Sequence, residues 1–142
     1  REQGALDEAV RYFQLSLKYD PGHALTYYHL GITLDQINRP DLAVPVYEKL
    51  LELEPDNVGA MNNFGVTLLH LGEYSREEEI YRKSIQHDPN HFFSRYGLLQ
   101  SLAAQKKYSE AMVEAKACLR LNPDSTEVQG IYSKLKLLTQ SR

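Results

Sequence analysis

The 142-residue sequence is poor in several features, and each shortage excludes a class of protein. A single cysteine, Cys118, excludes an internal disulfide framework and a multi-cysteine zinc site. No apolar run approaches the roughly 18–20 residues that a membrane-spanning helix needs. The net charge is only −3, and this mild acidity argues against nucleic acid as a partner, because nucleic-acid binding normally uses a basic face.

The first four residues contain neither a starting methionine nor an apolar signal core. We therefore expect the sequence to be a piece of a longer protein, whose other parts would carry any targeting signal or catalytic site. No motif names a compartment, and a cytoplasmic location is favoured. The composition, with 42% apolar and 25% charged residues, is that of an ordinary globular domain and not of a disordered segment.

Prolines recur at a fixed interval of 34 residues, and this period organises the whole chain. Each follows an Asp, Glu or Asn, and the series is Pro21, Pro55, Pro89 and Pro123. Because proline disfavours a helix in the residue before it and is tolerated at a helix start, each one marks a boundary between helices. A fixed period between 20 and 50 residues is typical of a stacked repeat array.

Within each period the apolar spacing is helical. Tyr27, Leu30, Gly31 and Leu34 follow the i, i+3, i+4, i+7 pattern, and a second apolar series follows after a short polar break. No segment has the alternation of a strand. Each period is therefore predicted to be two helices joined by a turn, which gives an all-α protein of seven or eight helices.

These residues resemble the tetratricopeptide repeats, whose 34-residue pattern is an aromatic, Leu-Gly, a later small residue, another aromatic and a closing proline. The resemblance rests on Tyr27, Leu30, Gly31, Leu34, Ala43, Tyr47 and Pro55, and on the copies of these positions one period later. It implies a right-handed α-solenoid of antiparallel helix pairs, folded as a single domain over residues 1–142. The expected parts are a half repeat (4–21), three repeats (24–57, 58–91 and 92–125) and a capping helix (126–139).

Two departures from the repeat pattern lead to structural expectations. Glu77 occupies the slot that holds Ala43 one period earlier, and a buried unpaired carboxylate would be costly, so we expect it to reach solvent or find a partner. Gly31 and Gly65 are expected where two helices cross, facing Ala43 and its equivalents. In the next copy Leu99 takes that slot, and Gly97 lies two residues before it.

The chain offers little for catalysis, and no enzyme activity, cofactor or metal is predicted. His87 and His91 are four residues apart, but the turn at Pro89 lies between them, so they do not share a helix face. Cys118 occupies a small-residue slot, which favours a buried structural thiol over a nucleophile. No glycine-rich phosphate loop, nucleophile elbow or acid–base pair is present.

The first helix of each repeat carries a second face that the core does not need, and this face is unusually poor in charge. Its exposed apolar and amide side chains indicate a binding patch. In the family this side lines a concave groove that takes extended peptide segments. The predicted groove residues are Tyr28, His29, Ile32, Gln36, Asn62, Asn63, Val66, His70, Phe93, Tyr96 and Gln100. The alternative for each is packing against a neighbouring helix.

We therefore predict a protein–protein interaction scaffold whose partner is a near-neutral peptide segment held by apolar contacts and amide hydrogen bonds. The two-carboxylate clamp of one family branch is not expected, because only Asn63 agrees among its positions, which are here Tyr28, Ile32, Asn63, Phe93 and Gly97. Two alternatives stay open: self-association into a structural assembly, and a targeting arm of a larger enzyme such as a glycosyltransferase or phosphatase.

Overall fold

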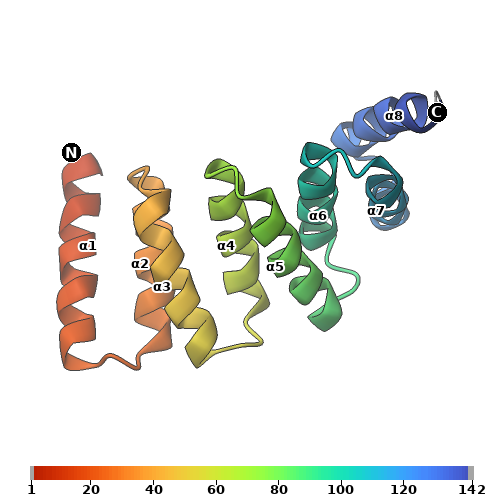
Figure 1. Cartoon of the computed structure of the whole chain (residues 1–142). Helices are drawn as coiled ribbons and strands as arrows, with labels where there is room; N and C mark the ends of the chain where they lie inside the picture. The colour runs from red at the N-terminus through yellow and green to blue at the C-terminus, as the bar shows by residue number, and fades with distance from the viewer. Residues whose placement is uncertain (1, 141–142) are drawn as a thin grey trace. The chain divides into compact units, whose positions relative to one another are not determined.

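A computed structural model describes residues 2–140, which form eight α-helices and no strand (Figure 1). The chain divides after Leu71 into two compact units. The first unit holds α1 (Glu2–Tyr19), α2 (Ala24–Gln36), α3 (Pro40–Leu53) and α4 (Val58–His70). The second holds α5 (Tyr74–His87), α6 (Phe92–Ala104), α7 (Tyr108–Leu121) and α8 (Thr126–Gln140). The all-α, helix-pair architecture predicted from the period is confirmed.

The four period prolines fix where every second helix ends. The helices α1, α3, α5 and α7 end at Tyr19, Leu53, His87 and Leu121, each two residues before its proline. The residue that precedes a proline is pushed away from the helical region of backbone space, so the helix must stop by that point. The regular spacing of the helices is therefore a direct consequence of the 34-residue proline step.

The turns inside the helix pairs share a left-handed residue that also recurs every 34 residues. Asn38, Gly72 and Lys106 have φ values of 62°, 72° and 62°, and each lies two residues after the end of a helix. A left-handed residue commonly ends a helix, and glycine adopts this conformation without a side-chain penalty. Asparagine tolerates it, but Lys106 carries a strained backbone in the same role.

The first unit is built around α2, which packs against α1 and α3, while α4 packs against α3. A Cβ atom on Gly31 would lie 2.7 Å from the ring of Tyr47, so this glycine allows α2 and α3 to approach closely. The sequence had led us to expect Ala43 opposite Gly31, but the nearest side chain is Tyr47. Tyr47 is fully buried and its ring stacks on Phe64 with centroids 5.8 Å apart.

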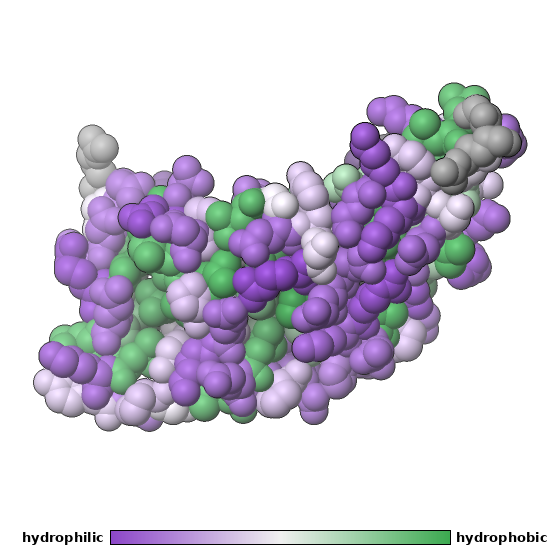
Figure 2. Space-filling view, in the orientation of Figure 1, coloured by the Kyte–Doolittle hydropathy of each residue, from purple (hydrophilic) through white to green (hydrophobic). Residues whose placement is uncertain are grey.

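The second unit has its own core, formed by side chains of α5 to α8. Its buried members are Tyr81, Leu98, Leu99, Leu102, Ala111, Ala115, Cys118, Val128 and Leu135. A Cβ atom on Gly97 would collide with the ring of Tyr81, so the glycine that is displaced by two positions from the repeat column permits the approach of α6 to α5. The visible face of this unit is mostly hydrophilic (Figure 2).

The expectation that Glu77 would reach solvent or find a partner is wrong. The residue is fully buried, and neither of its carboxylate oxygens has a hydrogen-bond partner among the described residues. Its position on α5 places the side chain among the buried residues of that helix. Burial raises the pKa of Glu77 to about 7. The pKa of Tyr81 is also raised, by its own burial and by the charge of Glu77.

The last helix, α8, packs on α7 through an apolar face, and its exposed side carries both charged and apolar residues. Val128 and Leu135 are buried, whereas Lys134 and Lys136 are exposed. The ammonium group of Lys136 lies 5.9 Å from the ring centroid of Tyr132. Leu137 and Leu138 are exposed as well, at 70% and 43%, so the outer face is not the uniformly polar one expected of a capping helix.

Candidate functional site

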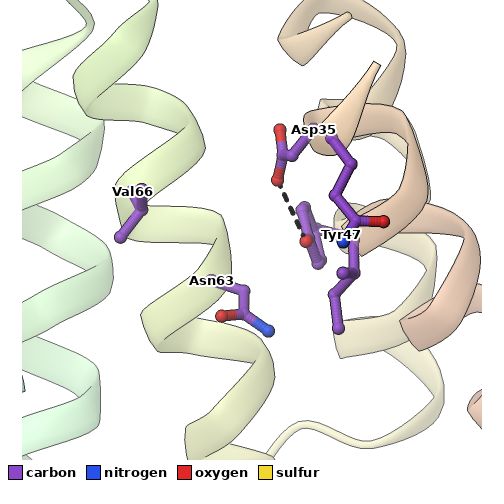
Figure 3. Close-up of a pocket in the computed structure, with 6 residues that line it drawn as sticks. Asp35, Tyr47, Asn63 and Val66 are labelled. Atoms are coloured by element: carbon purple, nitrogen blue, oxygen red, sulfur yellow. Dashed lines mark hydrogen bonds between the residues drawn. The ribbon is translucent and has the colours of Figure 1, made fainter. Parts of the chain in front are cut away.

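A cleft of about 290 Å³ opens in the first unit between α2 and α4, with α3 behind it (Figure 3). Its wall is made of apolar, amide and carboxyl side chains together. The lining residues are Ile32, Asp35 and Gln36 from α2, Tyr47 from α3, and Asn63 and Val66 from α4. Four of the predicted groove residues therefore meet around one opening: Ile32, Gln36, Asn63 and Val66.

The helical repeat explains why these side chains share one opening. On α2 the buried stripe of Leu30, Gly31 and Leu34 faces the neighbouring helices, which leaves Ile32 and Gln36 on the open side. The next first helix, α4, repeats this division one period later. Its start is fixed by a cap, because the backbone N–H of Ala60 donates to the side-chain oxygen of Asn57 at 2.9 Å.

The only charged side chain of the cleft, Asp35, is tied into the protein. The Tyr47 hydroxyl donates to Oδ2 of Asp35 at 3.1 Å, and the Thr67 hydroxyl lies 2.7 Å from the same oxygen (Figure 3). These contacts link α2, α3 and α4. Burial raises the pKa of Asp35 above its ordinary value, although the two hydroxyls and the nearby charge of His70 oppose that shift. One oxygen of this carboxylate, Oδ2, is therefore occupied, whereas Oδ1 is buried and has no hydrogen-bond partner among the described residues.

The two amide side chains of the cleft are not tied in this way. Asn63 is half-buried and extends from α4 toward the side of the cleft where Tyr47 lies (Figure 3). Gln36 is exposed on the facing helix. An amide both donates and accepts hydrogen bonds, so this pair matches the alternating N–H and C=O groups of an extended peptide. Ile32 and Val66 add apolar surface beside them, and Val66 is 45% exposed.

The other predicted residues of the first unit lie outside this cleft. Tyr28 lines a separate hollow of about 200 Å³ together with Leu25, Glu54 and Asn57. The ring of His29 stacks on Phe13 of α1, with centroids 6.0 Å apart, so this side chain serves a helix contact. Two further predicted residues, Asn62 (half-buried) and His70 (exposed), line neither opening.

The predicted residues of the second unit form an aromatic face on α6. Phe93 is 70% exposed and packs edge-on against Phe92, with ring centroids 5.7 Å apart. Phe92 in turn stacks on Tyr96, with centroids 6.0 Å apart and planes only 8° from parallel. Gln100 is half-buried and follows Tyr96 by one turn of the helix. Three aromatic rings are thus brought together around Phe92.

Sequence reasoning missed two residues of the cleft. Asp35 was not among the predicted groove residues, and Tyr47 entered the sequence analysis only as a residue of the repeat pattern. Tyr47 is indeed buried, but its hydroxyl reaches the cleft wall through Asp35. The signal that could have found this pair is the presence of a tyrosine hydroxyl in a core slot, since a buried hydroxyl needs a partner.

The remaining chemical candidates have structural surroundings. His87 ends α5, whereas the side chain of His91 accepts a hydrogen bond from the N–H of Ser94 and caps α6. Cys118 is buried, which raises the pKa of its thiol to about 12. Within residues 2–140 no three His, Cys, Asp or Glu side chains are grouped to hold a metal. In the same range, no helix has both the length and the apolar content needed to cross a membrane.

A family profile described as "Tetratricopeptide repeat" matches residues 28–92. Residues 28–92 belong to the tetratricopeptide repeat family. This tetratricopeptide-repeat segment includes every residue that lines the cleft, together with the whole of the helices α3, α4 and α5. The resemblance inferred from the proline period is thereby confirmed.

Two relatives share part of this chain's sequence. The peroxisomal targeting signal receptor of Candida glabrata is 33% identical over 73 residues, which are 51% of this chain and 12% of the receptor. The protein O-mannosyl-transferase Tmtc3 of Drosophila melanogaster is 22% identical over 123 residues, which are 86% of this chain and 13% of the transferase. The chain thus spans about an eighth of the length of these relatives.

Solved structures share the tetratricopeptide-repeat fold at low sequence identity. The crystal structure of MamA superposes with a TM-score of 0.92 at 18% identity, covering 99% of this chain and 82% of MamA. The first TPR of Spaghetti (RPAP3), bound to the HSP90 peptide SRMEEVD, superposes with a TM-score of 0.75 at 18% identity, covering 82% of this chain and 95% of that one. At this identity the likeness concerns the fold.

Proposed function

We propose that this chain is a non-catalytic interaction module whose first unit binds an extended, near-neutral peptide segment of a partner protein. The observation that carries the proposal is the Asn63 amide, which makes no hydrogen bond among the described residues although it is half-buried in the cleft. Oδ2 of the adjacent Asp35 carboxylate already meets two hydroxyls and its Oδ1 is buried, so we infer that recognition relies on amides and apolar surface.

The proposed contacts divide by type. Asn63 and Gln36 hydrogen-bond the peptide backbone, while Ile32 and Val66 cover its side chains. We expect about micromolar affinity, which corresponds to about −8 kcal/mol. The relative from Candida glabrata is named as a receptor for a targeting signal, which supports a segment-binding role for the matching repeats.

The test uses a peptide selected from a phage-displayed random library on the 142-residue chain, labelled and titrated by fluorescence anisotropy. We expect Asn63→Ala to weaken binding about tenfold, since a lost hydrogen bond with its partner left unpaired costs roughly 1–2 kcal/mol. The matched control is Gln14→Ala, which removes an exposed amide from α1 and should leave the affinity unchanged.

Salt separates this mode of binding from a charge clamp. Raising ionic strength from about 0.05 M to about 0.5 M should change the affinity less than about twofold, because few exposed charges are screened. A selected peptide that is rich in acidic residues and strongly salt-sensitive would contradict the proposal. Full affinity of Asn63→Ala would place binding on another surface.

The other predicted residues lie outside the cleft, and each adds a separate candidate surface to the proposal. The hollow lined by Tyr28 would take an apolar side chain of the peptide. On the second unit, Phe93 and Tyr96 belong to the aromatic face of α6, and Phe93 is exposed. Tyr28→Ala and Phe93→Ala should each reduce affinity while leaving the melting temperature near that of the parent. Gln100 follows this face on α6, whereas His29, Asn62 and His70 are the weakest candidates because they lie outside the cleft.

A second candidate is that these repeats form the recognition arm of a larger enzyme. The observation that favours it is the match to a transferase over 86% of this chain but only 13% of the transferase. The sequence of the full parent protein distinguishes the two candidates, because an arm would be joined to a recognisable catalytic domain.

A further inference from the structure

A hollow of about 200 Å³ lies one helical turn from the cleft, along the same helix α2. Its lining residues come from α2 and from the connection between α3 and α4, and they are Leu25, Tyr28, Glu54 and Asn57. A Cβ atom on Gly59 would lie 3.5 Å from the Tyr28 hydroxyl, so this tyrosine reaches the first turn of α4. The hollow and the cleft are therefore both bounded by α2 and α4.

The hollow combines an apolar wall with a carboxylate that is held in place. Leu25 is 58% exposed, and the Tyr28 hydroxyl makes no hydrogen bond with a described residue. Oε1 of Glu54 accepts a hydrogen bond from the side-chain amide of Asn57 at 2.9 Å, while Oε2 has no hydrogen-bond partner among residues 2–140. An apolar wall beside an open carboxylate oxygen suits a side chain with an aliphatic stem and a cationic end.

The segments that carry the hollow and the cleft are acidic. Residues 24–38 and 50–72 contain neither lysine nor arginine, and their acidic residues are Asp35, Glu52, Glu54 and Asp56. The two histidines of these segments do not line the hollow. The end of α3 adds a partial negative charge and the start of α4 a partial positive one, so the helix dipoles offset each other here. A cation is therefore the charged group that complements this side of the first unit.

The step from the hollow to the cleft matches the spacing of an extended peptide. Tyr28 precedes the cleft residue Ile32 by four positions, which is about 6 Å along the helix axis. In an extended chain every second side chain points to the same side, and two such side chains are about 6.6 Å apart. A segment that runs along α2 can thus place one side chain in the hollow and the side chain two positions away in the cleft.

We propose that the hollow is a subsite for a lysine or arginine of the bound segment, two positions from an apolar residue that occupies the cleft. This inference rests on the proposed function, and it narrows the occupant of the hollow to an aliphatic stem that ends in a cation. The stem packs on Leu25, while the cation lies against the ring of Tyr28 and donates to Oε2 of Glu54. A segment with one basic residue stays near-neutral, and one exposed ion pair adds little salt dependence.

The test starts from the peptides that a phage-displayed random library yields on the 142-residue chain. We expect a lysine or arginine two positions from an aliphatic or aromatic residue to be enriched among them. One such peptide is made with acetylated and amidated ends, which removes the terminal charges, and a second version has methionine in place of the basic residue. Anisotropy titrations at about 0.05 M salt should show the methionine version binding at least threefold more weakly.

A charge-neutral variant of the protein identifies where the cation binds. Glu54→Gln should weaken binding of the basic peptide about threefold and leave the affinity for the methionine version unchanged, because only the basic peptide uses the charge. The matched control is Glu52→Gln, which removes the same charge from an exposed position two residues earlier that does not line the hollow. It should change the affinity for neither peptide.

The outcomes separate the subsite from the proposed function. Selected peptides without the enriched basic residue, or a Glu54→Gln effect that is absent or equal for both peptides, would overturn the cation subsite. Asn63→Ala should weaken both peptides about tenfold, since it acts in the cleft. Full affinity of Asn63→Ala for both peptides would instead overturn the proposed function. Circular dichroism confirms that each variant keeps its helices.

Discussion

Asp35 in the first unit and Glu77 in the second are both carboxylates drawn into a helical interior, but only Asp35 meets hydrogen-bond donors. Two hydroxyls reach one oxygen of Asp35, whereas both oxygens of Glu77 lack a partner among the described residues. Burial raises the pKa of each group. The difference shows that a repeat array can use an inward carboxylate either as a link between helices or as an unsatisfied group that lowers stability when it ionises.

The largest expected effect is a loss of stability with rising pH, caused by Glu77. Its carboxyl titrates near 4.5 in the unfolded chain and near 7 in the folded one, so the folded state binds more protons between these values. The free energy of unfolding should therefore fall by about 3 kcal/mol as the pH rises from 4.5 to 7, and stay level above that. Urea denaturation at pH 5 and pH 8 measures the change.

The control for this pH effect is Glu77→Gln, which keeps the shape and cannot ionise. We expect this variant to match the parent near pH 5 and to exceed its stability at pH 8. The salt-linked Glu78 does not obscure the window: burial opposes its ionisation, but hydrogen bonds from Arg82, Lys107 and Gln105 outweigh that effect and lower its pKa to about 2. Its contribution is lost only as the pH falls below 4.5. Equal pH profiles for parent and variant would refute the role of Glu77.

The two close helix crossings give the next largest effect. Gly97→Ala should destabilise the chain by about 2 kcal/mol, because the added methyl group meets the buried ring of Tyr81. Gly31→Ala tests the corresponding crossing in the first unit, against Tyr47. Gly59→Ala is the control: its methyl group would lie 3.4 Å from Asn57, an ordinary contact, and alanine favours a helix. Thermal denaturation that ranks Gly59→Ala as the most damaging would contradict this account.

Removing one donor makes Asp35 more like Glu77. Tyr47→Phe keeps the buried ring but deletes the hydroxyl, which should cost about 1.5 kcal/mol and raise the pKa of Asp35 further. The loss should be larger at pH 8 than at pH 4, where the protonated carboxyl needs fewer donors. Chemical denaturation at the two pH values measures this loss, with Tyr12→Phe, at an exposed tyrosine of α1, as the control. An equal loss at both pH values would show that the Tyr47 hydroxyl does not serve the ionised carboxylate.

The smallest expected effect concerns the left-handed turns. Lys106→Gly should stabilise the second unit by about 0.5–1 kcal/mol, because glycine adopts a φ of 62° without strain. Asn38→Gly should gain less in the first unit, since asparagine already tolerates this backbone. Lys107→Gly, at the neighbouring position with a negative φ, should instead be neutral or destabilising. The shift in the urea midpoint distinguishes these three variants.

The sequence period was sufficient to predict the fold because one repeated residue set the boundaries. The step from Pro21 to Pro123 determined four helix ends, and the apolar series gave the helices between them. The lack of a hydrogen-bond donor near Glu77 could not be predicted in this way. The repeat position indicates where the side chain lies, but not which groups of other helices surround it. The role of Gly97 was also hidden, because it depends on how α6 crosses α5 and not on the repeat column.

The cleft was predictable only in part, for a similar reason. Ile32, Gln36, Asn63 and Val66 follow from which face of each first helix the core leaves open. Tyr47 and Asp35 are joined by a hydrogen bond between different helices, and the pattern along one helix cannot reveal it. The stacking of His29 on Phe13 depends in the same way on how α1 meets α2.

The attachment of α1 has a consequence for its motions. No residue of this helix is fully buried, and its packing is with α2. A helix held by a single half-buried interface opens at a lower free energy than the core, so its backbone amides should exchange with deuterium before those of α3. When α1 opens, the ring of His29 loses its stack on Phe13, while the Tyr47–Asp35–Thr67 link stays closed. Exchange protection along α1 is therefore a direct measure of how firmly α1 is held against α2.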